Sequence, residues 1–415
     1  MRPLLSPLRE AAWLNAERAT IAGWMLLAGL VLIVAVMLGT SQNGINMRGV
    51  PLGGDFTCYF SASWLALRGT AELAYDAVAI RAAQIEVLGG DYGFLPFFYP
   101  PLWLLMILPL ALLPYAAAHA AFVGGTAFAC WRGLRALHPD RWAVLPLLAF
   151  PSFWSNAVSG QNGFVSAALL AGATLNLDKR PILAGVFFGL LAYKPQLGLA
   201  VPLALAVTGR WRTFAAATAT VLGLALAATL AFGAGIWAAW LGSAAMGMPG
   251  MARGAVDFER FVSWFGAVRF AGGGVGLAYA VQAVVTVGAA CLLVVSLRRR
   301  PGARAEAALI VACTPLLAHY TLDYDLAILA LPMAWLLSEA SRDGFLPWER
   351  LGLAVAFIMP MVSGALASAT GLHFAPVATT AVFLLAVQRA AVGTAAAPVT
   401  GERFGGGSGV GLSFR

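Results

Sequence analysis

The chain has 415 residues, of which 60% are apolar and 11% charged, and its formal net charge is +8. A soluble protein of ordinary composition carries about 25% charged residues, so this composition excludes a soluble enzyme and a disordered or fibrous chain. The basic residues, all Arg except Lys179 and Lys194, lie in short clusters between apolar segments. This pattern is typical of the cytoplasmic loops of membrane proteins and argues against nucleic-acid binding.

The first apolar segment runs from Thr20 to Leu38 and contains no ionisable side chain, which is the pattern of a membrane-spanning helix. Arg2, Arg9 and Arg18 precede it, and no small-residue cleavage site follows it. We therefore expect a retained first span rather than a signal peptide, with residues 1–19 on the cytoplasmic side.

A long hydrophilic stretch, residues 39–95, follows as the first outer loop. Within it, the segments Phe56 to Arg68 and Asp76 to Leu88 place apolar residues at roughly helical spacing. We expect two amphipathic helices lying along the membrane interface. An irregular loop is the alternative.

The remaining apolar segments predict a polytopic transmembrane domain over residues 20–390. Residues 96–131 are interrupted by proline and are consistent either with one crossing or with two short helices around Pro114. Further spans are expected at Trp142 to Val158, Phe164 to Leu177, Pro181 to Tyr193, Leu197 to Thr208, Thr213 to Phe232, Gly276 to Leu297, Ala305 to Leu317, Tyr324 to Leu337, Leu351 to Leu366 and Pro376 to Gln388. A single crossing in residues 96–131 gives about 12 spans with both termini inside. The Gly-rich tail, residues 391–415, is expected to be disordered.

With the Arg clusters placed inside, most of the other polar groups fall on the outer face. Asp55 follows Gly53 and Gly54 and is a candidate general base, although Asp is also a good helix N-cap. Lys194 has two interpretations, a group that neutralises a phosphate and a lysine that reaches the lipid headgroups. Gln161 and Asn162 suit sugar hydroxyls, or form a polar turn between two spans.

Other polar groups on this face favour structural roles. Tyr99, in the sequence Tyr-Pro-Pro, is expected to shape the start of a span rather than contact a ligand. The residues Asp257, Glu259 and Arg260 are expected to form a solvated patch. His319, Asp323 and Asp325 have metal-binding side chains, but a hydrogen-bonded polar cluster is the favoured interpretation. The four cysteines lack metal-site spacing, so we expect neither a zinc site nor a disulfide framework.

Six motifs occur in one order along the chain: GGDFxxYFxAS, Tyr75-Asp76, FFYPPL, GQN, AGVFFGLLAYKPQLGL and HYTLDYD. Their order resembles glycosyltransferase family 87 over roughly residues 53–332. The resemblance implies an all-α membrane protein of the GT-C type that uses a polyprenyl-phosphate sugar, such as polyprenyl-phosphate mannose, as donor. It implies that Asp55 is the base and that Lys194 and His319 lie near the donor phosphate. The candidate substrate-binding residues are Tyr59, Tyr99, Gln161, Asn162 and Asp323.

The implied reaction is an inverting transfer of a hexose from the lipid donor to a lipid or glycan acceptor, without a cofactor or a metal. The partners would be the donor, the acceptor and the bilayer, and the site would face the periplasm or exterior of the plasma (inner) membrane. The alternatives are a transporter or flippase of lipid-linked sugars, for which we would expect ionisable groups near mid-bilayer and inverted repeats, and a glycan polymerase or ligase.

Overall fold

The computed structural model describes residues 6–396 except residues 43–44, 48 and 139–145. These residues form helices joined by turns, with isolated β-bridges but no strand among them. The expected all-α class is therefore confirmed. Residues 391–396, expected to be disordered, continue a helix, and the rest of that tail lies outside the described residues.

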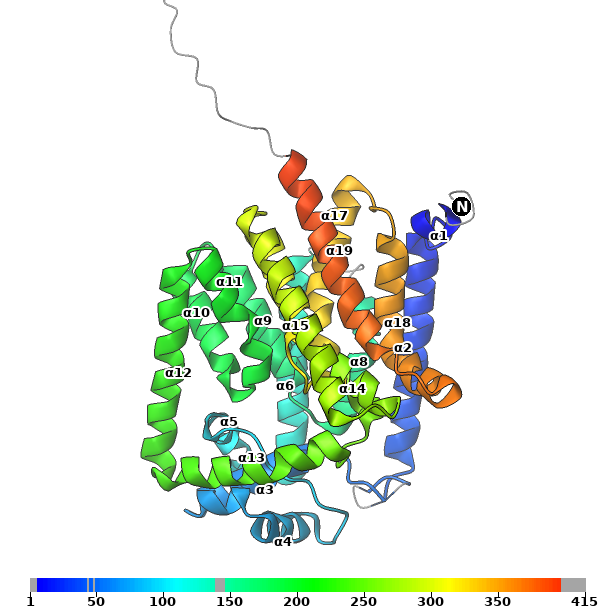
Figure 1. Ribbon diagram of the computed structural model, residues 1–415. Helices are drawn as coiled ribbons and strands as arrows, with labels where there is room; N and C mark the ends of the chain where they lie inside the picture. Colours follow the sequence, from blue (N-terminus) through cyan, green and yellow to red (C-terminus); the bar gives the residue numbers. More distant parts are fainter. Residues whose placement is uncertain (1–5, 43–44, 48, 139–145, 397–415) are drawn as a thin grey trace, which may run out of the picture.

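Among the described residues, five helices are long and apolar enough to cross a membrane, and Figure 1 shows them running roughly along the height of the molecule. They are α2 (Ala16–Gly39), α12 (Trp211–Phe232), α15 (Val275–Arg298), α18 (Glu349–Thr370) and α19 (Ala375–Ala396). A crossing needs about 20 residues, so these helices make the chain a multi-pass membrane protein.

The remaining helices inside the bundle are mostly too short for a full crossing, so the expected count of 12 spans is not confirmed. They are α8 (Pro151–Ser159), α9 (Gly163–Asn176), α10 (Pro181–Leu190), η3 (Leu191–Tyr193), η4 (Pro195–Gly198), α11 (Ala200–Val207), α16 (Ala303–Leu317), η6 (Asp323–Leu329) and α17 (Ala330–Asp343). Proline and tight turns divide these segments. Irregular backbone at membrane depth is tolerated where it is buried in protein.

Residues 96–131 contain one short and one long helix. The short piece is α5 (Pro101–Ile107) with its 3-10 continuation η2 (Leu108–Leu112), and Pro114 caps the long helix α6 (Tyr115–Leu137). At 1.5 Å per residue, α6 is about 35 Å long, enough for one crossing.

Two expectations are wrong in detail. The span expected from Trp142 to Val158 is broken before Pro151: residues 146–148 are helical, a turn follows, and α8 has only nine residues, about 14 Å in length. Residues 142–145 lie outside the described part of the chain. Helix α3 (Phe56–Leu67) forms where predicted, but most of its length is buried. It packs against η1 (Ala71–Tyr75), α4 (Ala77–Leu88) and α5, so it is a core helix rather than an amphipathic helix with one exposed face.

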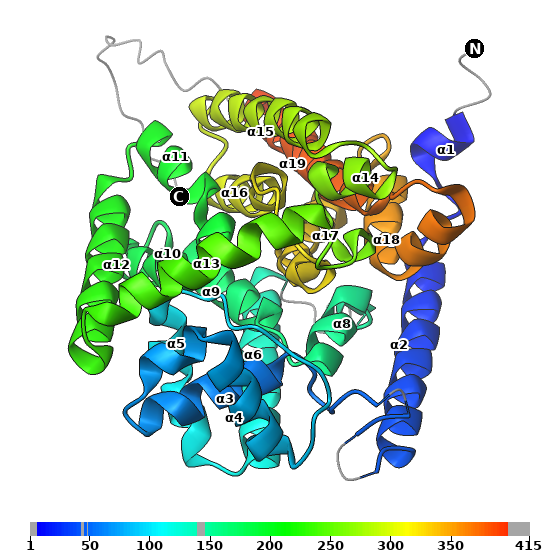
Figure 2. The ribbon, with the colours of Figure 1, turned by 60° about the horizontal axis from the view of Figure 1, so that its bottom comes forward.

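A long helix that the sequence pattern did not predict lies across one end of the molecule. Figure 2 shows α13 (Gly235–Arg253) lying across this end of the molecule close to α5, and it packs against α5 and η1. Trp240 Nε1 donates a hydrogen bond to the carbonyl of Phe98 at 3.1 Å, which ties α13 to the segment just before α5. The chain then forms η5 (Phe258–Arg260) and α14 (Trp264–Phe270). The N-terminal helix α1 (Ser6–Glu10) lies at the opposite end in Figure 1.

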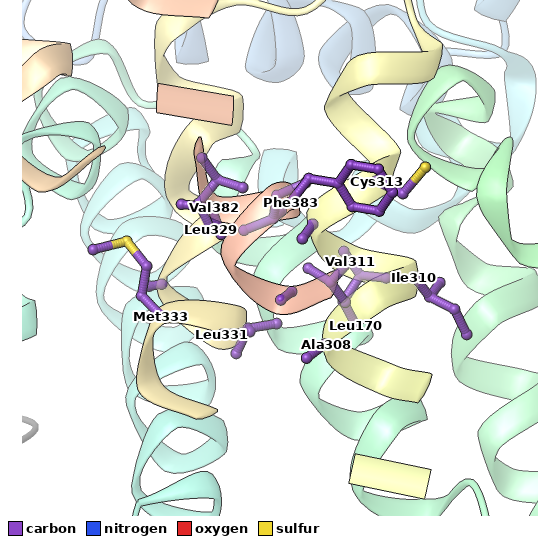
Figure 3. Close-up of a cluster of buried hydrophobic side chains, with 14 of the residues drawn as sticks. Leu170, Ala308, Ile310, Val311, Cys313, Leu329, Leu331, Met333, Val382 and Phe383 are labelled. Carbon is purple, nitrogen blue, oxygen red and sulfur yellow. The ribbon is translucent and has the colours of Figure 1, made fainter. Parts of the chain in front are cut away.

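The core of the bundle is centred on α16, which is buried from Ala305 to Leu317. Figure 3 shows its side chains packed with others from neighbouring helices: Leu170, Ala308, Ile310, Val311, Cys313, Leu329, Leu331, Met333, Val382 and Phe383. The residues of the 3-10 helix η6 are buried from Tyr324 to Leu329. This packing fixes the position of Asp325, a charged residue at the edge of the core.

Candidate active site

The backbone around Asp55 is held by a close approach between two turns. Gly53 and Gly54 have φ values of +86° and +41°, which glycine adopts at little cost. Gly160, in the turn between α8 and α9, lies so close that a Cβ on it would stand 2.5 Å from the carbonyl oxygen of Gly53. The amide of Asp55 donates to the carbonyl of Ser159 at 2.9 Å. Asp55 is thereby placed beside Gln161.

The Asp55 side chain does not cap α3, although Asp55 occupies the N-cap position. Gln161 Nε2 instead donates to Asp55 Oδ2 at 2.6 Å. Among the described residues, Asp55 Oδ1 accepts no hydrogen bond that would compete for a ligand hydroxyl. The carboxylate is half-buried, so it is held at one oxygen and open at the other.

Two tyrosines and two amides extend inward from Asp55. Tyr59 donates to Gln161 Oε1 at 2.5 Å, and Asn162 Nδ2 donates to the Tyr59 hydroxyl at 3.0 Å. The Tyr99 hydroxyl lies 2.9 Å from that of Tyr59 and 3.3 Å from Gln161 Oε1. The side chains of Tyr59, Tyr99 and Asn162 therefore orient the Gln161 amide that faces Asp55.

Lys194 lies at the inner end of this network. Its Nζ donates to Asp325 Oδ1 at 2.5 Å and to Asn162 Oδ1 at 3.2 Å. Both charged side chains are buried, with exposed fractions of 3% and 1%. Asp325 Oδ2 also accepts from the amide of Leu322 at 3.1 Å. Seven residues thus form one polar network, namely Asp55, Tyr59, Tyr99, Gln161, Asn162, Lys194 and Asp325.

A second group of polar side chains lies at the accessible edge of the network. Ser155 donates to Asp323 Oδ2 at 2.6 Å, and Arg260 Nη2 lies 3.4 Å from Asp323 Oδ1. The rings of Tyr324 and Tyr320 face this group: Arg260 Cζ lies 5.8 Å from the Tyr324 ring centroid, and Tyr320 packs edge-on against Phe261.

Electrostatics link this second group to Asp55. Burial lowers the pKa of the Arg260 guanidinium, but Asp323 and then Asp55 outweigh burial, so that its pKa is raised. Burial, Asp325 and Asp55 raise the pKa of Tyr320, which Arg260 lowers to a smaller extent. Arg260 and Tyr320 are therefore within electrostatic reach of the candidate base, and the raised pKa of Tyr320 keeps its phenol uncharged.

His319 lies apart from the polar network. Its ring packs 5.8 Å from that of Phe265 and 5.5 Å from that of Tyr279, measured between centroids. Burial lowers the pKa of its imidazole. No described contact joins this ring to Lys194, Asp323 or Asp325. In the described ranges no three His, Cys, Asp or Glu side chains are grouped so as to hold a metal ion, and all four cysteines are free.

The sequence identified six members of the network and placed Asp325 among the polar groups of the outer face. It missed Arg260, which was expected to belong to a solvated patch. The two acidic residues of that expected patch have other surroundings. Asp257 is exposed. The Glu259 carboxylate accepts a hydrogen bond from Ser368 at 3.2 Å, and the Glu259 carbonyl lies 2.7 Å from His373 Nε2. The one available signal was the Asp-x-x-Arg sequence in an outer loop, which does not separate a site arginine from a surface arginine.

Comparison with known proteins gives one match. The family model described as "Glycosyltransferase family 87" matches residues 97–319, more than half of the chain. This range contains Tyr99, Gln161, Asn162, Lys194 and His319, whereas Asp55, Tyr59 and Asp325 lie outside it. Neither a curated protein nor a solved structure matches the chain.

Proposed function

This chain belongs to glycosyltransferase family 87, and we propose that it transfers a hexose, with mannose as the first candidate, from a polyprenyl-phosphate donor to a hydroxyl of a lipid or glycan acceptor. The coarser statement, that it is a membrane glycosyltransferase, follows from the family and from the five apolar helices. The family match also favours an enzyme over a transporter or flippase. We place the reaction at the outer face of the plasma (inner) membrane.

The mechanism rests on one observation: only one oxygen of the Asp55 carboxylate accepts a hydrogen bond among the described residues. Gln161 holds Oδ2, and Oδ1 is open to a ligand hydroxyl. Asp55 would take the proton of the acceptor hydroxyl as that oxygen attacks the anomeric carbon. The bond from the anomeric carbon to the phosphate oxygen breaks, and polyprenyl phosphate leaves with the electron pair. A single displacement of this kind inverts the anomeric configuration.

The surroundings of Asp55 support this role. A general base is effective when it is positioned within hydrogen-bond reach of the proton that it removes, and the close contact of the two turns fixes the backbone of Asp55. A lipid-linked donor would keep its prenyl chain in the bilayer while the sugar phosphate reaches the end of the molecule where α3 and α13 lie (Figure 1). Gln161 and Asn162, expected from the sequence to contact the substrate, are 6% and 0% exposed and would orient Asp55 rather than bind the sugar.

The test compares wild type with Asp55→Asn and, as a matched control, Asp76→Asn. Asp76 lies in the same outer loop and caps α4 through hydrogen bonds from the amides of Val78 and Ala79, a role that Asn can also fill. Purified proteins in detergent are given radiolabelled polyprenyl-phosphate mannose and membrane lipids. We expect transfer by wild type and Asp76→Asn and a loss of about 10²-fold or more in Asp55→Asn.

Three outcomes would count against parts of the proposal. Equal transfer by Asp55→Asn would remove Asp55 as the base. Transfer only from other polyprenyl-phosphate sugars would replace mannose. No transfer from any polyprenyl-phosphate sugar, together with transfer from a diphosphate-linked oligosaccharide, would identify a glycan polymerase or ligase instead.

A further inference from the structure

Lys194, the cation that sequence reasoning placed near the donor phosphate, is not accessible. Its side chain is 3% exposed and its charge is already paired with Asp325. Of the three N–H donors of an ammonium group, one is used by Asp325 and one by Asn162, and the ring of Tyr324 lies 4.7 Å from Nζ. A phosphate would have to displace Asp325 from a buried ion pair. Separating such a pair leaves a buried charge without a partner, which is strongly unfavourable.

Arg260, unlike Lys194, is accessible and only weakly paired. Its side chain is 39% exposed, and within the described residues the guanidinium makes a single hydrogen bond, the long one of 3.4 Å to Asp323. A guanidinium has five N–H donors in a planar fork, so most of them are unused. Asp323 has a shorter bond, at 2.6 Å, from Ser155. The Asp323 carboxylate is therefore well hydrogen-bonded without Arg260, and the guanidinium is free to bind a second anion.

The segment that carries Arg260 is fixed on both sides. The amide of Val262 donates to the carbonyl of Thr321 at 2.9 Å, and Phe261 forms a β-bridge with Leu322. On the other side, Glu259 is bonded to Ser368 and His373. This anchoring distinguishes Arg260 from a mobile surface arginine, because its position relative to the Tyr324 ring and to Asp55 is set by the fold.

We propose that Arg260 binds the phosphate group of the lipid-linked donor, whereas Lys194 is a positioning residue that acts through Asn162. This inference rests on the proposed function. The guanidinium fork pairs with two phosphate oxygens, within electrostatic reach of the Asp55 carboxylate. As the glycosidic bond breaks, negative charge accumulates on that phosphate, and Arg260 stabilises it there. Lys194 and Asp325 meanwhile hold the Asn162 amide, which donates to Tyr59 and so orients Gln161.

The first test compares Arg260→Gln with the matched control Arg253→Gln. Arg253 is an exposed arginine at the end of α13, in the same outer loop, with no contact to the network. We measure binding of sugar-free polyprenyl phosphate to the purified proteins, and KM and kcat for the sugar donor. For Arg260→Gln we expect polyprenyl phosphate to bind at least tenfold more weakly and the donor KM to rise by a similar factor, with Arg260→Lys intermediate. Arg253→Gln should match wild type. Unchanged binding and KM in Arg260→Gln would overturn the assignment.

The second test concerns Lys194 and uses the double variant Lys194→Met/Asp325→Leu, which removes both buried charges together. We expect its kcat to fall because Asn162 loses a partner, while polyprenyl phosphate binds within about threefold of wild type. Loss of binding in the folded double variant, with binding retained in Arg260→Gln, would place the phosphate at Lys194. If the double variant does not fold, the Arg260 comparison decides alone.

Direct binding separates this inference from the proposed function. A wild-type protein that binds polyprenyl phosphate through Arg260 but transfers no sugar would contradict the function and leave the phosphate site in place. Sugar transfer by wild type, together with unchanged polyprenyl phosphate binding in Arg260→Gln, would support the function and contradict the phosphate site.

Discussion

Among single residues, Gln161 has the most direct control over the candidate base. Its Oε1 accepts from Tyr59 at 2.5 Å, which turns Nε2 toward Asp55. A hydrogen bond to a charged group is worth about 1.5–3 kcal/mol, and each 1.36 kcal/mol is a factor of ten in rate. We therefore expect Gln161→Ala to lower kcat by about 10- to 100-fold while the donor KM changes by less than about threefold. Steady-state kinetics with the lipid donor measure both.

Tyr99→Phe is the graded comparison for Gln161→Ala. It removes the 3.3 Å bond to Gln161 and the 2.9 Å bond with the Tyr59 hydroxyl. The bond from Tyr59 to Gln161 stays in place, so kcat should fall by less than about threefold. A Gln161→Ala enzyme with normal kcat and a raised donor KM would show that Gln161 binds the sugar and does not position Asp55.

At this scale the sequence could identify residue types but not their partners. Asp55, Gln161 and Asn162 stand out because polar groups between apolar segments are few. The burial of Lys194 could not be predicted, because it depends on Asp325, which is 131 residues away. Arg260 was missed for the same reason, since its partners come from other outer segments of the chain.

Among the elements, the contact between the α3 turn and the α8–α9 turn decides whether the site forms. A methyl group on Gly160 would meet the carbonyl of Gly53 at 2.5 Å and Phe56 Cβ at 2.6 Å, and Gly160 also has φ of +61°. Gly160→Ala must push the two turns apart and separate Asp55 from Gln161. Overpacking of this kind costs about 1–3 kcal/mol, so we expect a lower unfolding temperature in detergent and a loss of transfer.

Gly209→Ala separates the steric clash from the backbone conformation. Gly209 has φ of +69°, but nothing lies within 4 Å of a Cβ placed there. It should show only the modest cost of a left-handed alanine, about 1 kcal/mol, with transfer close to wild type. Equal losses of transfer in the two variants would mean that the contact between the turns is not what positions Asp55.

The elements themselves were predictable where apolar spacing is uninterrupted, as in α2, α12 and α15. The helix α13 was not predicted, because its sequence includes Gly242, Gly247 and Pro249 and therefore looks like a loop. Its stability comes instead from tertiary contacts such as the hydrogen bond of Trp240 to the carbonyl of Phe98. The burial of α3 was missed because a hydrophobic segment between polar turns can lie in a core as well as at an interface.

For the whole molecule, the sequence predicts membrane insertion better than it predicts the number of crossings. The Arg clusters define one face, and five full-length helices are evident from hydropathy. Helices such as α9, α10 and α16 are shorter, and hydropathy alone does not distinguish a half-crossing helix buried among its neighbours from a span that faces lipid. Packing around α16 supplies that information, and it exists only in three dimensions.

The orientation gives the last prediction, which uses single cysteines in a Cys291→Ser background. Cys58, Cys130 and Cys313 are buried, so the introduced cysteine is the main target for a membrane-impermeant maleimide. Arg253→Cys, at the end of α13, should be labelled in intact cells that expose the outer face. Arg299→Cys, just after α15, should be labelled only after permeabilisation. Both native side chains are exposed, so a difference in labelling reports the side of the membrane.

The two positions lie on either side of α15, whose 24 residues span about 36 Å. Labelling of both cysteines from the same side would mean that α15 does not cross, and it would place the Arg298–Arg300 cluster on the same face as Asp55. Labelling of Arg299→Cys alone in intact cells would mean that the protein has the opposite orientation and that the candidate site faces the cytoplasm. Only labelling of Arg253→Cys from outside agrees with a donor that presents its sugar phosphate at the outer face.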